Sequence, residues 1–126
     1  MIKNSKGTTT IKAAELQSKQ TLLLFYKSGC GPCETTIETL KTNYTKLLAK
    51  GLKIIALSSD TDETEFKTTS ATFPWQDTFC DLEGTNGVNF KNYAVIGTPT
   101  MYLLDSKGMI VKKTGNGGGV DEVKFI

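Results

Sequence analysis

The chain has 126 residues, a formal net charge of +2 and 38% hydrophobic residues, which suits one globular domain over residues 1–126. It contains no histidine and no arginine, so Ser-His-Asp triads, Cys-His pairs and histidine-ligated metals are excluded. The 15 lysines and 13 acidic residues form no dense basic patch, and we expect no nucleic-acid partner.

The sequence shows neither a membrane-spanning segment nor an export signal. No apolar run approaches the roughly 20 residues needed to cross a bilayer. The first six residues carry lysines, but no apolar stretch follows them, so no signal peptide is expected within the chain. A fragment of a longer exported protein would lack these signals too, and nothing in the pattern indicates an oligomeric state.

The first half of the chain predicts a strand, a helix and a second strand. Residues 21–28 form a continuous apolar run, typical of a strand that is buried on both faces. From Pro32 the apolar residues recur at helical spacing, and Gly51 stands where a helix cap belongs. Residues 52–58 form a second apolar run. A strand-helix-strand unit is right-handed, so the sheet is expected to be partly parallel.

The second half predicts shorter elements. A cap at Thr61 or Asp60 is expected to begin a short helix, and Phe73-Pro74-Trp75 is expected to end it. The Asp-Ser-Lys-Gly sequence at 105–108 indicates a hairpin turn. The predicted elements are a helix at 62–72, a strand at 75–80, a helix at 88–93, hairpin strands at 100–105 and 109–114, and a short closing helix at 120–126.

Cys30-Gly31-Pro32-Cys33 lies where the first predicted strand passes into the helix. Unpaired backbone N–H groups and the positive dipole end of a helix favour a thiolate at Cys30. The two-residue spacing lets the second sulfur approach the first, and a proline is tolerated at an early helical position. Gly31 leaves the first sulfur open to a partner. The pattern predicts thiol–disulfide exchange, in which Cys30 attacks and Cys33 resolves the mixed disulfide.

Two other interpretations of this pair stay open: half of a zinc site, and a purely structural disulfide. A closed zinc site needs four ligands, and Cys80 is the only further candidate in a chain without histidine. We therefore expect no metal and no cofactor. Cys80 itself is interpreted as a small, half-buried apolar residue, and a third redox thiol is the alternative.

The cysteine motif and its surroundings resemble the thioredoxin-like superfamily, in particular the TlpA/ResA type of bacterial thiol–disulfide oxidoreductase. The resemblance rests on residues 27–33, the Gly-Thr-Pro-Thr sequence at 97–100, Trp75 and the hairpin turn, and it covers roughly residues 12–115. It implies an α/β, thioredoxin-like fold with a central mixed β-sheet flanked by helices.

The resemblance also implies roles for residues outside the cysteine pair. Pro99 is expected to follow a cis peptide bond beside the two sulfurs, and the backbone of Thr98 to pair with an extended substrate segment. A plain proline at the start of a strand is the alternative. Gly31 and Pro32 would border the reactive sulfur. Trp75 is expected in the core or near the active site. The alternative is that its ring forms a platform on which substrate binds.

Three positions depart from the family pattern. Relatives often have tryptophan directly before the first cysteine, where this chain has Gly29. Thioredoxins carry a buried acid at the position of Leu24, and the TlpA/ResA type often has a glutamate at the position of Thr36. Such a carboxylate assists proton transfer at the resolving thiol. Another group must do this here, and Glu34, Lys27 and water are the candidates.

The sequence therefore predicts an enzyme that exchanges disulfides with protein substrates, and Gly31-Pro32 favours the reducing direction. Its expected partners are protein disulfides or dithiols and an upstream thiol electron donor. A peroxiredoxin would have an arginine beside its cysteine, and a copper chaperone would have a histidine ligand. A non-catalytic docking module of a larger envelope protein is the alternative function. The resemblance implies a periplasmic or cell-envelope location, with the cytoplasm as the alternative.

Overall fold

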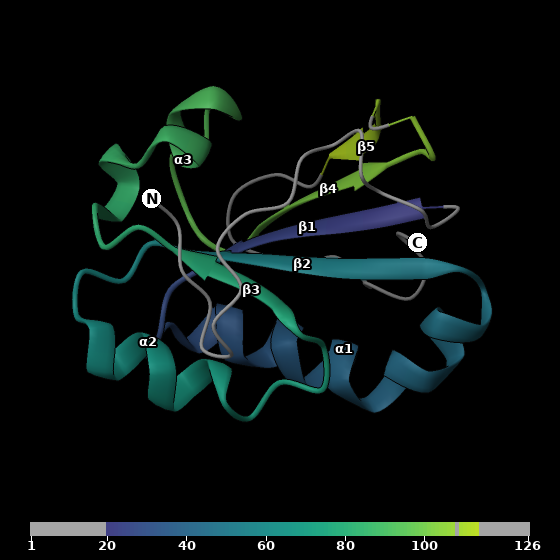
Figure 1. The fold of residues 1–126 in the computed structure, drawn as a ribbon, viewed down its shortest axis with the longest axis horizontal. Coiled ribbons are helices and arrows are strands. Elements are labelled where there is room, and N and C mark those ends of the chain that lie inside the picture. Colours follow the sequence, from purple (N-terminus) through teal and green to yellow (C-terminus); the bar gives the residue numbers. More distant parts are fainter. Residues whose placement is uncertain (1–19, 108, 114–126) are drawn as a thin grey trace.

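The computed structural model describes residues 20–107 and 109–113, which form a mixed β-sheet with helices on both faces (Figure 1). This is the thioredoxin-like fold that the sequence predicts. The elements in chain order are β1 (Gln20–Tyr26), α1 (Gly31–Ala49), β2 (Leu52–Ser58), α2 (Glu63–Ser70), β3 (Asp77–Cys80), a 3-10 helix (Gly84–Asn86), α3 (Val88–Asn92), β4 (Thr100–Leu104) and β5 (Ile110–Lys113).

The sheet has five strands in the order β3-β2-β1-β4-β5, so β1 lies at its centre. Strands β1, β2 and β3 are parallel, with Tyr26 opposite Ser58 and Ser58 opposite Cys80. Strand β4 is antiparallel to β1, and its first residue, Thr100, lies opposite Phe25. The carboxyl ends of three strands and the start of a fourth therefore meet at one edge of the sheet. The cysteine motif follows β1 at this edge.

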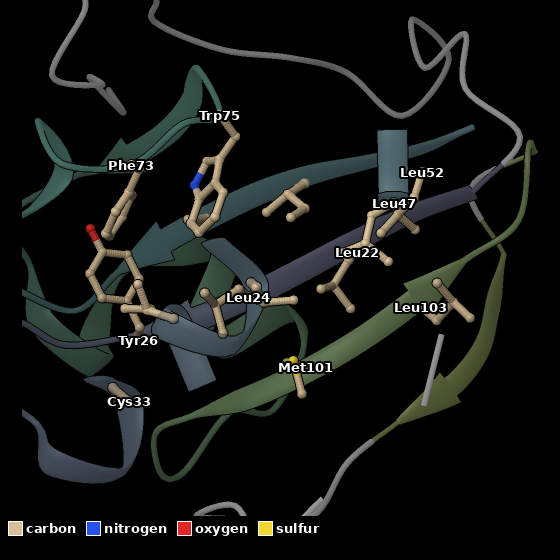
Figure 2. Packing of buried hydrophobic residues seen from close by; sticks show 14 residues of the cluster. Leu22, Leu24, Tyr26, Cys33, Leu47, Leu52, Phe73, Trp75, Met101 and Leu103 are labelled. Atoms are coloured by element: carbon tan, nitrogen blue, oxygen red, sulfur yellow. The ribbon is translucent and has the colours of Figure 1, made fainter. Parts of the chain in front are cut away.

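Two hydrophobic clusters cover the two faces of the sheet, because successive residues of a strand point to opposite faces. Figure 1 shows α1 and α2 on one side of the sheet and α3 on the other. The cluster under α1 contains alternate residues of β1 together with the inward face of the helix, and Figure 2 shows it from close by. Its members include Leu22, Leu24, Tyr26, Cys33, Ile37, Leu40, Leu47, Phe73 and Trp75. The cluster on the other face includes Leu23, Phe25, Leu57, Phe79, Phe90 and Tyr102.

The structure corrects two predicted element boundaries near the cysteine motif. Strand β1 ends at Tyr26, two residues earlier than predicted, and Gly29 in the turn that follows adopts a positive φ of 77°. Helix α2 is capped by Asp62, whose Oδ1 accepts a hydrogen bond from the Glu65 N–H at 3.0 Å. The predicted caps were one and two residues too early. Asp60 instead turns inward and is fully buried.

The other predicted elements agree with the structure to within about two residues. Strand β2 has the predicted bounds, and Gly51 lies directly after the cap of α1 with a φ of 85°. The predicted closing helix at 120–126 lies outside the described residues. Within 20–107 and 109–113, no helix combines the length and apolar composition required to span a membrane.

Candidate active site

Cys30 is the N-cap residue of α1, and Cys33 lies in the first turn of that helix. The Cys30 backbone is extended, with φ −83° and ψ 116°, and its Sγ accepts a hydrogen bond from the Cys33 N–H at 3.3 Å. The Cys30 side chain is partly exposed, whereas Cys33 is fully buried in the cluster under α1. The first sulfur is therefore open to a partner, and the second is shielded behind it.

Thr98 lies in the segment just before β4 and contacts the Cys30 sulfur. Its Oγ1 and its carbonyl oxygen each lie 3.8 Å from the Cys30 sulfur, which accepts from the hydroxyl and donates to the carbonyl. The Thr98–Pro99 peptide bond is cis, as predicted, and Pro99 is buried. Residues that are 68 positions apart in sequence thus meet around one sulfur.

The two thiols differ in their electrostatic surroundings. Burial, followed by the hydrogen bond with Cys30, raises the pKa of Cys33 from 9.0 to about 12. The Thr98 hydroxyl and the backbone of Lys27 act in the opposite direction, because both stabilise the Cys33 thiolate. Cys33 therefore stays a thiol at neutral pH until its surroundings change.

Gly31 and Pro32, which follow Cys30 in the chain, are both exposed. Pro32 is the second residue of α1, where its missing N–H costs no helical hydrogen bond. Gly29 precedes the reactive cysteine and has no atom within 4 Å of the position that a Cβ would occupy. A Cβ would meet free space here, but the backbone of any other residue would have to adopt the left-handed conformation.

The positions of the two missing carboxylates are both buried. Leu24 is 0% exposed and Thr36 is 2% exposed, so each lies within the core beneath the cysteine motif. At neither position does the chain supply a charged group for proton transfer.

Trp75 lies in the core rather than on the surface. The residue is 2% exposed, and its ring centroid is 4.8 Å from that of Phe73 and 6.0 Å from that of Tyr44. Figure 2 shows it in the same cluster as Tyr26 and Cys33. This burial corrects the alternative in which Trp75 forms a platform for substrate, because a substrate protein cannot reach the indole.

Cys80 ends β3 at the same sheet edge but does not join the cysteine pair. It is 4% exposed, and its thiol donates to the carbonyl oxygen of Asp60 at 3.2 Å and accepts from the Leu82 N–H at 3.4 Å. Burial raises its pKa above the usual value. These contacts are those of a buried structural thiol.

A carboxylate at this edge was missed by the sequence analysis as a site residue. Asp60 follows β2, and its oxygens accept hydrogen bonds from the backbone N–H and the hydroxyl of Ser28, at 3.0 and 2.5 Å. The signal was available: parallel strands end at one edge, so an acid directly after the second strand lies beside the turn after the first. Its position beside a helix start suggested a cap instead.

A groove of about 320 Å³ lies between the active-site turn and one face of α2. We call it the α2 groove, and it is lined by Ser28, Gly29, Thr64, Glu65, Thr68 and Thr69. Its walls carry hydroxyl and methyl groups and a single carboxylate. In the part of the chain that the structure describes, no three cysteine or acidic side chains gather as a metal site would require.

Comparisons with known proteins agree with this geometry. The model of the AhpC/TSA family matches residues 1–113. The thiol-disulfide oxidoreductase ResA of Bacillus thuringiensis subsp. konkukian is 30% identical over 103 residues, which are 82% of this chain and 58% of ResA. The chain thus spans little more than half the length of this relative.

Two solved structures show the same fold. A thiol-disulfide oxidoreductase from Bacteroides fragilis is 28% identical, with a TM-score of 0.75 over 92% of this chain and 87% of that chain. StoA from Bacillus subtilis is 24% identical, with a TM-score of 0.68 over 98% of this chain and 92% of that chain. With its Cys-x-x-Cys pair and this fold, the chain belongs to the AhpC/TSA family and is a homologue of ResA-type thiol–disulfide oxidoreductases.

Proposed function

We propose that the protein exchanges disulfides with protein substrates, with Cys30 as the nucleophile and Cys33 as the resolving thiol. The observation that carries this proposal is the unequal exposure of two sulfurs in one helical turn: Cys30 is partly exposed and Cys33 is fully buried. Thiol exchange needs an accessible attacking sulfur and a second sulfur that reacts only with the first. The arrangement supplies both.

The reaction proceeds in two displacements. The Cys30 thiolate attacks one sulfur of the substrate disulfide, which forms a mixed disulfide and releases the other substrate sulfur as a thiolate. Cys33 then loses its proton to water or to that thiolate and attacks the Cys30 sulfur, which releases the second substrate thiolate. Two electrons have passed from the protein dithiol to the substrate, and the protein holds a Cys30–Cys33 disulfide.

Backbone and hydroxyl groups activate the sulfurs in this mechanism. The Cys33 N–H, in the first turn of α1, donates a hydrogen bond to the Cys30 sulfur at 3.3 Å. For the second step, the Thr98 hydroxyl and the Lys27 backbone stabilise the Cys33 thiolate as it forms. They stabilise the thiolate, and the proton itself passes to water or to the released substrate thiolate.

We assign the reducing direction to the protein. The Gly31-Pro32 pair resembles that of the reducing thioredoxins. The high pKa of Cys33, about 12, supports the assignment, because a resolving thiol that stays protonated adds no thiolate stabilisation to the reduced state. A weakly stabilised dithiol gives up its electrons readily.

An extended segment of the substrate is the expected ligand of the surface around Cys30. The Thr98 backbone lies directly before β4 and within 3.8 Å of the reactive sulfur, where a substrate strand can pair with it. The exposed Gly31 and Pro32 allow close approach on one side, and the α2 groove receives side chains on the other. The single carboxylate in the groove, Glu65, favours a substrate with a basic side chain there.

From its resemblance to the TlpA/ResA type, we also propose that the protein works in the periplasm or cell envelope. It would be reduced there by an upstream thiol donor. Labelling intact cells with a membrane-impermeant maleimide tests the location, because Cys30 is modified only if it faces the outside of the cytoplasmic membrane. Protection of Cys30 until the cells are lysed would place the protein in the cytoplasm instead.

The insulin reduction assay with dithiothreitol tests the proposed activity. The wild-type protein is expected to accelerate precipitation of the insulin B chain, and Cys30→Ser to reduce the rate to that of dithiothreitol alone. Wild type without acceleration would overturn the proposal and favour a docking module. A stoichiometric metal released from the purified protein by a chelator would favour the zinc interpretation.

A further inference from the structure

Asp60 is a fully buried carboxylate directly behind the active-site turn. It is 0% exposed, and each of its oxygens accepts one hydrogen bond from Ser28. No ion pair found within residues 20–107 and 109–113 involves it. Burying a carboxylate without a cation is costly, so its hydrogen bonds must stabilise it. Both of the carboxylate bonds go to a residue two positions before the reactive cysteine.

Asp60 is itself fixed by three strands. Its N–H donates to the Ser58 hydroxyl at 2.9 Å, and its carbonyl oxygen accepts from the Cys80 thiol at 3.2 Å. The preceding residue, Ser59, donates its N–H to the Tyr26 carbonyl at 2.9 Å. The carboxylate therefore projects from a segment tied to the ends of β1, β2 and β3. It is a rigid support.

The turn that Asp60 holds contacts both cysteines. The Lys27 carbonyl accepts from the Cys30 N–H at 3.3 Å, and the Lys27 backbone also stabilises the thiolate of Cys33. Ser28 is the next residue along the chain, so fixing its N–H fixes the Lys27–Ser28 peptide group, whose carbonyl accepts from the Cys30 N–H. Ser28 also reaches the first turn of α2, because its hydroxyl lies 3.4 Å from the Glu65 carbonyl.

We propose that Asp60 is a positioning residue of the cysteine pair: it holds Ser28 so that the backbone of Lys27 faces Cys30 and Cys33. This inference rests on the proposed redox role of the pair. It makes Asp60 a support acting through the turn, rather than a proton acceptor.

The electrostatics agree with an indirect role. The titratable groups whose pKa responds to Asp60 are Tyr26 on β1 and Cys80 on β3, and in both cases burial is the larger cause. The causes that set the pKa of Cys33 are burial, Cys30, Thr98 and the Lys27 backbone. A direct effect of the charge on the resolving thiol is therefore not expected.

Asp60→Asn tests the proposal, because it keeps the shape but replaces one acceptor by an NH₂ group that cannot accept from Ser28. Two quantities are measured: the equilibrium of the Cys30–Cys33 disulfide with glutathione, and the pH profile of Cys30 alkylation by iodoacetamide, read by mass spectrometry. Without this support, the Lys27 carbonyl no longer holds the Cys30 N–H at 3.3 Å, and the turn that carries the reduced pair is stabilised less. We expect the disulfide to be favoured about tenfold, which lowers the reduction potential by about 30 mV, and the alkylation profile to move to higher pH.

The sign of the change distinguishes positioning from charge. If Asp60 acted through its negative charge, its removal would make the thiolate easier to form, and both quantities would move in the opposite direction. That outcome, or no change, would overturn the proposal.

Two further variants accompany this test, one as a second test and one as a control. Ser28→Ala removes the hydroxyl but keeps the N–H, and because Ser28 is partly exposed the fold should tolerate it. It should shift both quantities in the same direction as Asp60→Asn, but less, and it decides the matter if Asp60→Asn does not fold. Asp77→Asn is the matched control at the start of β3, where it breaks an ion pair with Lys53 at 3.1 Å, and it should change neither quantity. Neither measurement uses a protein substrate, so wild-type inactivity on insulin would contradict the proposed function without affecting this result.

Discussion

Cys33 and Cys80 are both buried thiols at the same edge of the sheet, and their surroundings differ in one decisive way. Burial raises the pKa of both. The sulfur of Cys33 lies beside a second cysteine and the hydroxyl of Thr98, whereas the sulfur of Cys80 lies between the Asp60 carbonyl and the Leu82 N–H. Low exposure alone therefore does not mark a redox thiol. A partner sulfur within the same helical turn does.

Substituting the two thiols one at a time should give the largest expected effect in the insulin assay. Cys33→Ser should bring the rate down to that of dithiothreitol alone, because Cys30 can still form the mixed disulfide but no thiol of the protein resolves it. When dithiothreitol is left out, the trapped complex is expected on a non-reducing gel. Cys80→Ser should stay close to the wild-type rate, because the partners of its sulfur, Asp60, Leu82 and Ser58, all lie outside the cysteine pair. Equal losses in both variants would make Cys80 a redox thiol and end the distinction.

The same two thiols should differ in what they contribute to folding. Cys80→Ala leaves the Asp60 carbonyl and the Leu82 N–H without the sulfur that now bonds both. Leaving the buried Asp60 carbonyl unpaired costs about 1–3 kcal/mol, whereas Leu82 is 37% exposed and its N–H can bind water, so we expect a loss of about 1–3 kcal/mol in the free energy of unfolding. Urea denaturation of the reduced protein measures it. A loss below the error of the extrapolation would show that water or a small shift satisfies both groups.

Alkaline pH should destabilise the reduced protein through Cys33. Its folded pKa, about 12, lies above the ordinary value of 9.0, so the unfolded chain loses this proton first as pH rises. The stabilising contribution is complete below pH 9 and is lost on the way to pH 12, with a slope of at most about 1.4 kcal/mol per pH unit. Urea denaturation between pH 8 and 10.5 should show a flatter slope in Cys33→Ala than in wild type. Parallel slopes would contradict the raised pKa.

Thr98→Val should give the smallest effect. It changes the surroundings of Cys33 and leaves the thiol itself in place. It removes the hydroxyl that lowers the pKa of Cys33 and keeps the side-chain shape. We expect the resolving step to slow a few-fold while the attack of Cys30 changes less. Stopped-flow measurement of mixed-disulfide decay separates the two steps. Restoration of the rate by Thr98→Ser, which returns the hydroxyl, is the control.

Much of the fold could be predicted because its patterns are local. The continuous apolar runs at 21–28 and 52–58 and the helical spacing between them are enough for a parallel strand-helix-strand unit, which the structure contains. The cap of α2 was predicted wrongly because three acceptors, Asp60, Thr61 and Asp62, follow one another. Which of them faces the helix depends on the direction in which the chain leaves β2.

The site was only partly accessible from the sequence. The motif around Cys30 is recognisable in the sequence by itself. The resemblance predicted that Thr98 and Pro99 lie beside it, and the structure places Thr98 in contact with Cys30 and shows a cis bond before Pro99. The contact between Asp60 and Ser28 spans 32 residues and depends on the register of β1 and β2. Burial of Trp75 likewise depends on how the segment before β3 packs against α1. Such contacts require the assembled sheet.

The sulfur that we assign as nucleophile is also the cap of a 19-residue helix. A thiolate accepts a hydrogen bond strongly, whereas a sulfur in a disulfide accepts it weakly. Each catalytic cycle would therefore loosen and restore the first turn of α1. The amide proton of Cys33 becomes a built-in reporter: its NMR chemical shift and its exchange with solvent should follow the oxidation state of the protein, without any label.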